Sequence, residues 1–193
     1  MKFEEKLLSD IKNSIEIKKK IILKKKNILR SINLIYAAIK KKKKILICGN
    51  GGSAADAQHL SAEFIDRLKP DINRKPLPLL SLALDTSHLT ACGNDFGFEY
   101  IFERPLKALG SKGDVLICIS TSGKSENIVR VLKLSKKMGV KSISLLGGDG
   151  GFAKKHSNIN IIVDSTDVAR IQEVHIFLGH FILQEVERKF LKK

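Results

Sequence analysis

Tryptophan is absent from this 193-residue chain, and the remaining aromatic residues are nine phenylalanines and two tyrosines. Nucleic acid is commonly held by aromatic side chains that stack on bases, so this composition argues against such a partner. The formal net charge of +15 points the other way, but it is concentrated at one end: residues 1–44 carry 15 Lys and Arg against 4 Asp and Glu. Lysines outnumber arginines 28 to 7, whereas base and phosphate recognition relies on the arginine fork. We therefore do not expect nucleic acid as a partner.

The chain also has few cysteines and no long apolar run. Cys48, Cys92 and Cys118 are an odd number without the paired spacing of a zinc knuckle, and they read as reduced thiols rather than a disulfide framework. No apolar stretch reaches the roughly 20 residues of a membrane span. Residues 1–5 lack the apolar segment of a secretory signal. We expect a cytoplasmic protein with no membrane partner.

Neither proline nor glycine occurs before Gly49. Apolar residues recur at helical spacing from about Phe3 to Ala38, which predicts one long helix or two consecutive ones. We expect residues 1–42 to form a helical arm that packs over one face of a sheet or contacts another subunit.

From Lys44 onward, strand and helix patterns alternate, which is typical of right-handed βαβ units and a parallel sheet covered on both faces. The predicted strands are Ile45–Cys48, Leu79–Leu84, Val115–Ile119, Ser142–Leu146 and Ile159–Val163. The predicted helices are Ala54–Leu68, Ser87–Ala91, Phe98–Leu109, Ser125–Met138, Phe152–His156 and Val168–Phe190. The fold class is therefore α/β, a three-layer sandwich with a five-stranded parallel sheet. Residues 1–193 form a single domain, with the α/β core at 43–193 after the arm.

Two loops of small residues follow the two most apolar strands. The first is Asn50-Gly51-Gly52-Ser53, and the second runs from Ser120 to Ser125. Each leads into a helix, where backbone N–H groups and hydroxyls converge on the helix N-terminus and suit a bound anion, most often phosphate. Two such loops at the carboxyl edge of one parallel sheet indicate a site for a phosphorylated small molecule.

Two helices carry polar side chains at informative spacing. His59 and Glu63 lie four residues apart and share one helix face, so both can reach one metal ion or one substrate. A surface His–Glu pair is the ordinary interpretation, but the nearby phosphate-type loop favours a site. In the last helix Gln172 and His180 are separated by about 12 Å along the axis. Either that helix starts irregularly near Gln172, or a site using both residues draws on more than one chain.

Four segments together resemble the phosphoheptose isomerases of the sugar-isomerase (SIS) domain proteins, over essentially the whole chain. The Ser-Thr-Ser-Gly loop alone marks only the SIS superfamily, whereas the four motifs in this order are specific to a small group. The segments are Asn50-Gly51-Gly52-Ser53-Ala54-Ala55-Asp56-Ala57-Gln58-His59, Gly93-Asn94-Asp95-Phe96-Gly97, Ser120-Thr121-Ser122-Gly123-Lys124-Ser125 and Arg170-Ile171-Gln172-Glu173-Val174-His175.

The resemblance implies the function and a set of site residues. It implies conversion of sedoheptulose 7-phosphate to D-glycero-D-manno-heptose 7-phosphate, the entry to heptose for surface polysaccharides, by a homotetramer with one zinc ion per subunit. The implied metal ligands are His59, Glu63, Gln172 and His180. The implied substrate contacts are Asn50, Gly51, Gly52, Ser53, His59, Glu63, Asn94, Asp95, Ser120, Thr121, Ser122, Ser125 and Gln172. Some members have Asn where this chain has Lys124, which adds a charge near the phosphate.

The chemistry gives these residues roles. Aldose–ketose isomerisation moves a proton between neighbouring carbons through an enediol, and it needs a base, an acid and a group that polarises the carbonyl. Glu63 is the candidate base, and His180 is the candidate acid. A carboxylate bound firmly to zinc is a poorer base, so either Glu63 detaches from the metal or the ion is structural or inhibitory.

Two alternatives remain open. One is a non-catalytic SIS paralogue that binds the bacterial replication initiator; it would not need the carboxylate of Glu63 or the imidazole of His180. The other is an isomerase of a shorter sugar phosphate, which explains the loops but explains the Gln172 and His180 helix less well.

Overall fold

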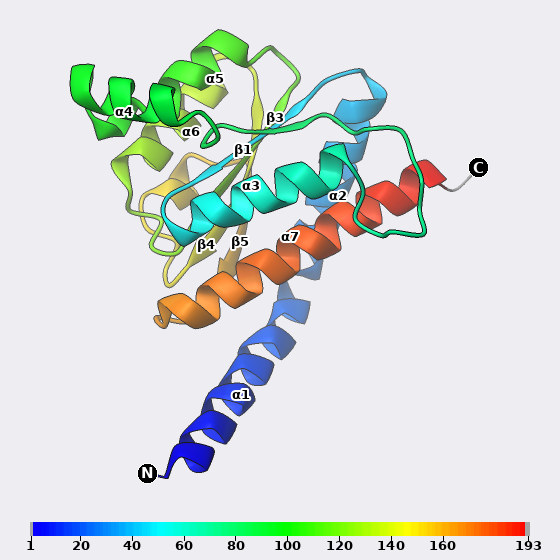
Figure 1. Cartoon of the computed structure of the whole chain (residues 1–193), viewed down its shortest axis with the longest axis vertical. Coiled ribbons are helices and arrows are strands. Elements are labelled where there is room, and N and C mark those ends of the chain that lie inside the picture. Colours follow the sequence, from blue (N-terminus) through cyan, green and yellow to red (C-terminus); the bar gives the residue numbers. More distant parts are fainter. Residues whose placement is uncertain (1, 192–193) are drawn as a thin grey trace.

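The fold is an α/β sandwich around one parallel sheet, as predicted. The computed structural model describes residues 2–191, and the five strands are ordered β2-β1-β3-β4-β5 with every neighbouring pair parallel (Figure 1). The strands are β1 (Ile45–Gly49), β2 (Leu79–Ser81), β3 (Val115–Ser120), β4 (Lys141–Gly147) and β5 (Ile159–Val163). The α-helices are α1 (Phe3–Lys20), α2 (Lys25–Lys40), α3 (Gly52–Ile65), α4 (Thr86–Asp95), α5 (Glu103–Leu109), α6 (Glu126–Lys137) and α7 (Val168–Leu191), and short 3₁₀ turns are η1 (Ile21–Lys24), η2 (Phe98–Tyr100) and η3 (Ala153–Lys155).

The two central strands explain why the sheet is buried on both faces. Every residue of β1 and β3 is buried, and their residues pair in register from Ile45 with Val115 to Gly49 with Ile119. Full burial of a side chain such as Ile47 contributes about 1.5–3 kcal/mol. Because β1 and β3 are adjacent and parallel, the loops that follow them emerge side by side at the carboxyl edge of the sheet.

Each face of the sheet has its own apolar core. One core joins side chains of α2, α3 and α7 to alternate strand residues such as Ile47 and Ile117. The other joins the opposite strand residues, such as Leu46 and Leu116, to the region from α4 to α6. The two helices that carry the predicted polar side chains, α3 and α7, therefore lie on the same face of the sheet (Figure 1).

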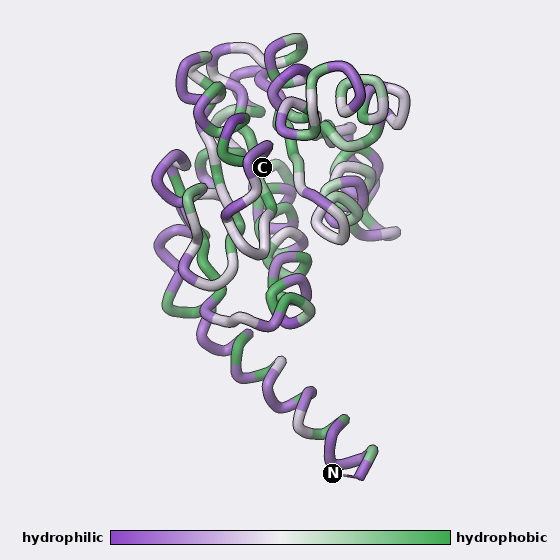
Figure 2. The backbone as a smooth tube through the Cα atoms, turned by 90° about the vertical axis from the view of Figure 1, so that its left-hand side faces the viewer, coloured by the Kyte–Doolittle hydropathy of each residue, from purple (hydrophilic) through white to green (hydrophobic). Residues whose placement is uncertain are grey.

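The predicted N-terminal arm consists of two helices with different surroundings. α2 packs on the sheet, with Ile28, Ile32 and Ile35 buried. α1 projects beyond the rest of the molecule, with apolar and hydrophilic residues interspersed along it (Figure 2), and it is tied to α7 by a 2.6 Å hydrogen bond from Ser14 to Glu173. Several large apolar side chains of α1 are exposed: Phe3, Leu7, Leu8, Ile11 and Ile15.

Several predicted elements differ from the observed ones. The predicted helix 54–68 spans Gly52–Ile65, and the predicted helix 152–156 is the 3₁₀ turn η3. The predicted strand 79–84 ends at Ser81. The predicted helix 98–109 is divided into η2 and α5, and Pro105 lies in the first turn of α5, where its missing N–H costs no helical hydrogen bond. The predicted helix 87–91 begins at Thr86, where Asp85 caps it by accepting a hydrogen bond from the His88 backbone, and it continues to Asp95. Within residues 2–191, no helix combines the length and hydrophobicity that a membrane span requires.

Candidate functional site

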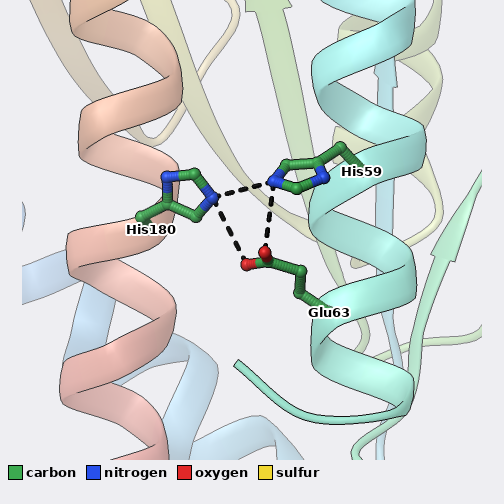
Figure 3. Close-up of side chains that lie close together, drawn as sticks. All are labelled: His59, Glu63 and His180. Carbon is green, nitrogen blue, oxygen red and sulfur yellow. Dashed lines mark hydrogen bonds and ion pairs between the residues drawn. The ribbon is translucent and has the colours of Figure 1, made fainter. Parts of the chain in front are cut away.

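Three predicted site residues from two helices converge at one point. Nε2 of His59 lies 2.9 Å from Nε2 of His180, and the two rings are perpendicular. The carboxylate of Glu63 faces both rings, with Oε1 3.2 Å from His59 Nε2 and Oε2 3.3 Å from His180 Nε2 (Figure 3). All three side chains remain partly open to solvent, Glu63 least. We call these residues the His–Glu–His cluster.

Close packing of α3 against α7 brings the cluster together. On α3, His59 and Glu63 lie one turn apart, on either side of the buried Leu60. On α7, His180 follows Gly179, where an added Cβ would lie only 2.4 Å from Leu60 Cδ1. The absence of a side chain at Gly179 therefore lets the two helices approach closely enough for the cluster to form.

The cluster has the dimensions of a metal site. In a tetrahedral zinc site, ligand atoms about 2.0–2.1 Å from the ion lie about 3.3 Å from one another. The two Nε2 atoms lie 2.9 Å apart, and a different oxygen of Glu63 faces each of them, at 3.2 and 3.3 Å. With one ligand atom taken from each residue, the three atoms lie within 4.8 Å of one another. Oε2 of Glu63 is buried and makes no hydrogen bond within residues 2–191, although Nε2 of His180 faces it at 3.3 Å. A buried carboxylate oxygen normally accepts a hydrogen bond. Two imidazoles and one carboxylate can therefore hold a metal ion, with a coordination position left for water or substrate.

Asp56 lies beside the cluster and was not predicted. It precedes His59 by three residues on α3, and its Oδ2 is buried without a hydrogen-bond partner among the described residues. Burial raises the pKa of its carboxyl group, and the nearby His59 and His180 oppose that shift. The spacing Asp56–His59–Glu63 places all three on neighbouring positions of one helix face, so helical periodicity could have identified it.

A second group of predicted residues lines a pocket where the two central strands end. We call it the serine pocket. The second loop forms most of its wall, the first loop and the start of α3 contribute Asn50 and Ser53, and α7 contributes the Gln172 amide. Its lining residues are Asn50, Ser53, Ile119, Ser120, Thr121, Ser122, Ser125 and Gln172.

Backbone geometry makes the serine pocket possible. Gly51 has φ +55° and precedes α3, and Gly123 has φ +62°, a conformation that L side chains rarely adopt. An added Cβ at Gly52 would lie 2.4 Å from Nε2 of Gln172, so glycine there lets this amide enter the pocket. Ser120 Oγ accepts a hydrogen bond from the backbone N–H of Gly123, which shapes the loop from within.

The two loops are fastened to each other by a pair of amides. Asn50 donates to Asn127 Oδ1 and Asn127 donates to Asn50 Oδ1, both at 2.9 Å. Asn127 is buried in the first turn of α6. Sequence reasoning missed it because the pairing spans 77 residues and nothing in the local pattern signals it.

The serine pocket has the features of an anion site. Ser125 is the N-cap residue of α6, yet its side chain makes no capping hydrogen bond within the described chain. Lys124 is exposed, and its backbone N–H donates to Ser122 Oγ. Hydroxyl groups and the positive end of the α6 dipole therefore face one small volume, an arrangement that favours a phosphate.

Two predicted residues stand apart from both groups. Asn94 and Asp95 form the last turn of α4, are exposed, and share a 2.9 Å hydrogen bond. Neither lines the serine pocket. Gln172 also does not join the His–Glu–His cluster. Because α7 is continuous from Val168, the idea that it begins irregularly near Gln172 is wrong, and this residue lies two turns before His180.

Comparisons with known proteins agree with this geometry. The family model of the SIS domain matches residues 11–147. The phosphoheptose isomerase of a Nitratiruptor species is 52% identical over 153 residues, which cover 79% of this chain and 81% of that protein.

Two solved structures match nearly the whole chain. The phosphoheptose isomerase of Francisella tularensis has a TM-score of 0.92 and 32% identity, and the match covers 97% of this chain and 100% of the other. The phosphoheptose isomerase of Neisseria gonorrhoeae has a TM-score of 0.90 and 35% identity over the same shares.

Proposed function

Because the chain belongs to the phosphoheptose isomerases, enzymes with a SIS domain, we propose that it converts sedoheptulose 7-phosphate to D-glycero-D-manno-heptose 7-phosphate. It is a sugar-phosphate isomerase. The proposal extends to the pathway, in which this product is the first precursor of ADP-heptose for lipopolysaccharide and related surface polysaccharides. The observation that carries the proposal is the His–Glu–His cluster between α3 and α7. The helix that provides His180, α7, also places Gln172 in the serine pocket.

The two regions suit the two ends of such a substrate. The serine pocket offers hydroxyls and a helix N-terminus to the phosphate. The cluster offers a base and an acid to the carbonyl end. Along α7, Gln172 and His180 are about 12 Å apart, a separation that favours a long sugar with its phosphate at the far end from the carbonyl.

In the proposed mechanism Glu63 takes the proton from the carbon beside the carbonyl, and an enediol forms. His180 supplies a proton to the carbonyl oxygen, and Glu63 returns its proton to the former carbonyl carbon. The hydroxyl on the carbon that Glu63 deprotonated gives its own proton back to His180 and becomes the new carbonyl, so both residues end in their starting protonation states. The 2.9 Å contact between the imidazoles requires one Nε2 to donate and the other to accept. His59 can thus hold the ring of His180 in the orientation that acid catalysis needs.

A zinc ion bound by His59, Glu63 and His180 would polarise the carbonyl and stabilise negative charge on its oxygen. Such binding occupies the carboxylate that serves as the base, so the proposed cycle needs Glu63 free of the ion when the proton moves. Gln172 lies in the serine pocket of its own chain, so its proposed role as a fourth ligand requires a second subunit.

The proposed assembly is a homotetramer with sites at subunit contacts. The exposed apolar residues of α1 support it, because an unpaired apolar stripe on a projecting helix favours association. Mixed oligomers of inactive Glu63→Gln and Gln172→Ala chains test the shared site. Rescue of turnover supports a Gln172 that acts across chains, and inactive hybrids in demonstrably mixed oligomers contradict it. Mixtures of Glu63→Gln and His180→Gln serve as the control, because those residues meet within one chain.

The proposed reaction is tested with purified protein and sedoheptulose 7-phosphate, by following formation of the aldoheptose phosphate in a coupled assay. Parallel assays with a chelator and with added zinc show whether the ion helps or hinders. Turnover of this substrate, and not of pentose or hexulose phosphates, supports the proposal. A folded protein that binds the sugar phosphate without turning it over contradicts it and favours a binding protein.

A further inference from the structure

Arg74 is a buried cation that the proposed chemistry does not use, yet it touches both helices of the site. Its side chain is 5% exposed. Nη2 donates to the backbone carbonyl of Glu63 at 3.1 Å, and Nη1 donates to the carbonyls of Asp66 and Lys75, each at 3.2 Å. Nε donates to the carboxylate of Glu187 on α7.

The carbonyl contacts place Arg74 at the C-terminal end of α3. Glu63 lies in the last turn of this helix, and Asp66 is its C-cap residue. Carbonyls in a last turn lack helical partners and carry the negative end of the helix dipole. The guanidinium satisfies two of them with one fixed fork, and one of the two belongs to the candidate base. The backbone that carries the Glu63 side chain is therefore held by Arg74 directly.

The ion pair between Arg74 and Glu187 connects this end of α3 to α7. Glu187 is 2% exposed and follows His180 by seven residues, so the two lie on one face of α7 about 10 Å apart along the axis. Arg74 thus links the end of α3 that bears Glu63 to the helix that bears His180.

Two contacts then fix the separation of α3 and α7 on either side of the site. At one, Gly179 lets α7 approach Leu60 of α3. At the other, Arg74 joins the C-terminal end of α3 to Glu187. Glu63 lies between these two points along α3, so rotation or withdrawal of either helix would separate its carboxylate from the imidazoles.

We propose that Arg74 is a positioning residue of the active site, which through its bonds to the Glu63 carbonyl and to Glu187 sets the distance between the base on α3 and the acid on α7. This assignment rests on the roles proposed above for Glu63 and His180. It predicts a specific kinetic signature, because the serine pocket lies at the N-terminal ends of α3 and α7, whereas Arg74 contacts these helices near their C-terminal ends. Loss of Arg74 should lower kcat and leave KM for the sugar phosphate nearly unchanged.

A variant that restores stability separates positioning from general folding. Arg74→Met alone leaves the carboxylate of Glu187 buried without its cation, which destabilises a protein strongly. The double variant Arg74→Met/Glu187→Leu removes both charges and fills the space with apolar atoms, a replacement that is often neutral or stabilising. It still lacks the bond to the Glu63 carbonyl and the link between the helices.

The matched control is Lys44→Met. It too removes the cation of a buried carboxylate, Asp114, whose side chain is 1% exposed and 2.6 Å from Lys44 Nζ. This pair lies where β1 and β3 begin, at the edge of the sheet opposite the serine pocket. We expect the control to shift the unfolding midpoint and to leave kcat within twofold of the wild type.

The decisive kinetic comparison uses the double variant. We expect an unfolding midpoint near that of the wild type, a kcat at least tenfold lower and a KM within twofold. A kcat within twofold of the wild type overturns the proposal, as does a fall in kcat that the Lys44→Met control reproduces.

A crystal structure of the double variant tests the geometry without any substrate. We expect the Nε2 atoms of His59 and His180 to lie beyond hydrogen-bond distance, against 2.9 Å in the native chain. An unchanged His–Glu–His cluster overturns the positioning role. Because this readout needs no turnover, it decides the role of Arg74 even if the native protein fails to isomerise sedoheptulose 7-phosphate.

Discussion

The His–Glu–His cluster and the serine pocket are built in opposite ways. The serine pocket is made mainly by contiguous loop residues. Their conformation is fixed by glycines and by local hydrogen bonds, such as that from the Gly123 backbone N–H to Ser120 Oγ. The cluster is made by side chains of two separate helices, and His59 and His180 are 121 residues apart in the chain. One region depends on local backbone conformation and the other on tertiary packing.

This difference assigns different sensitivities to the two regions. A change in the pocket should remove a proposed contact with the substrate and leave the rest of the fold in place. A change in the packing of α3 against α7 should displace the proposed catalytic groups, which are not themselves altered. Substitutions in the pocket should therefore act on KM, and substitutions between the helices should act on kcat.

The largest expected effect is that of Glu63→Gln, which tests the proposed base of the His–Glu–His cluster. The amide cannot accept the proton from the sugar carbon, and general bases typically contribute 10²–10⁴-fold, so we expect kcat to fall about 10³-fold. Calorimetry should show that the sugar phosphate still binds.

The matched control is Glu185→Gln on α7, which removes a carboxylate outside the cluster. Glu185 forms an ion pair with Arg188, whose side chain is largely exposed. The variant should keep wild-type turnover. Retained activity of Glu63→Gln would remove Glu63 from the role of base.

His175 lies on α7 between the two regions, and its burial should make the stability of the protein depend on pH. Burial lowers the pKa of its imidazole to about 4 from an ordinary 6.5, and the Leu146 backbone opposes this shift. The imidazole of His175 thus binds a proton near pH 6.5 in the unfolded chain, but only near pH 4 in the native chain. The free energy of unfolding should fall by about 3 kcal/mol as the pH drops across that window, and the loss should be complete below it.

Urea unfolding at a series of pH values checks this expectation. His175→Gln removes the titrating group, so its stability should change less between pH 6.5 and 4 than that of the native chain. Equal pH dependence in both proteins would show that the imidazole of His175 titrates normally.

Gly179→Ala tests the close packing of α7 against α3. The new methyl would meet Leu60 Cδ1 at 2.4 Å, and overpacking of this kind typically costs about 1–3 kcal/mol of stability. Forcing α7 away from α3 should also widen the cluster, so we expect kcat to fall about tenfold with little change in KM. Steady-state kinetics and thermal unfolding measure both effects.

The control for this variant keeps the new methyl group and removes the side chain that it would contact. Leu60→Ala in the same chain eliminates the atoms that the methyl would contact, so the double variant should recover part of the lost kcat. If the double variant is no more active than Gly179→Ala, spacing at this contact does not govern catalysis.

The sequence predicted most of the sheet and the pocket because their signals are local. Apolar runs bounded by turn residues located all five strands, and Asn50 to Ser53 and Ser120 to Ser125 are contiguous motifs. Asn127, Gly179 and Arg74 could not be found in this way, because each matters through a partner in a distant segment. The end of the predicted strand 79–84 was misplaced because its apolar residues continue to pack after its pairing with β1 ends.

The smallest expected effect on kcat is that of Ser125→Ala, which tests the serine pocket. The Ser125 side chain makes no capping hydrogen bond within residues 2–191, so its loss should leave α6 intact and remove only a contact with the phosphate. A hydrogen bond to a charged group is worth about 1.5–3 kcal/mol, and we expect KM to rise at least tenfold while kcat stays within threefold. Ser135→Ala, on the same helix but buried away from the pocket, should leave KM unchanged. A fall in kcat without a rise in KM would mean that the pocket and the cluster act as one unit.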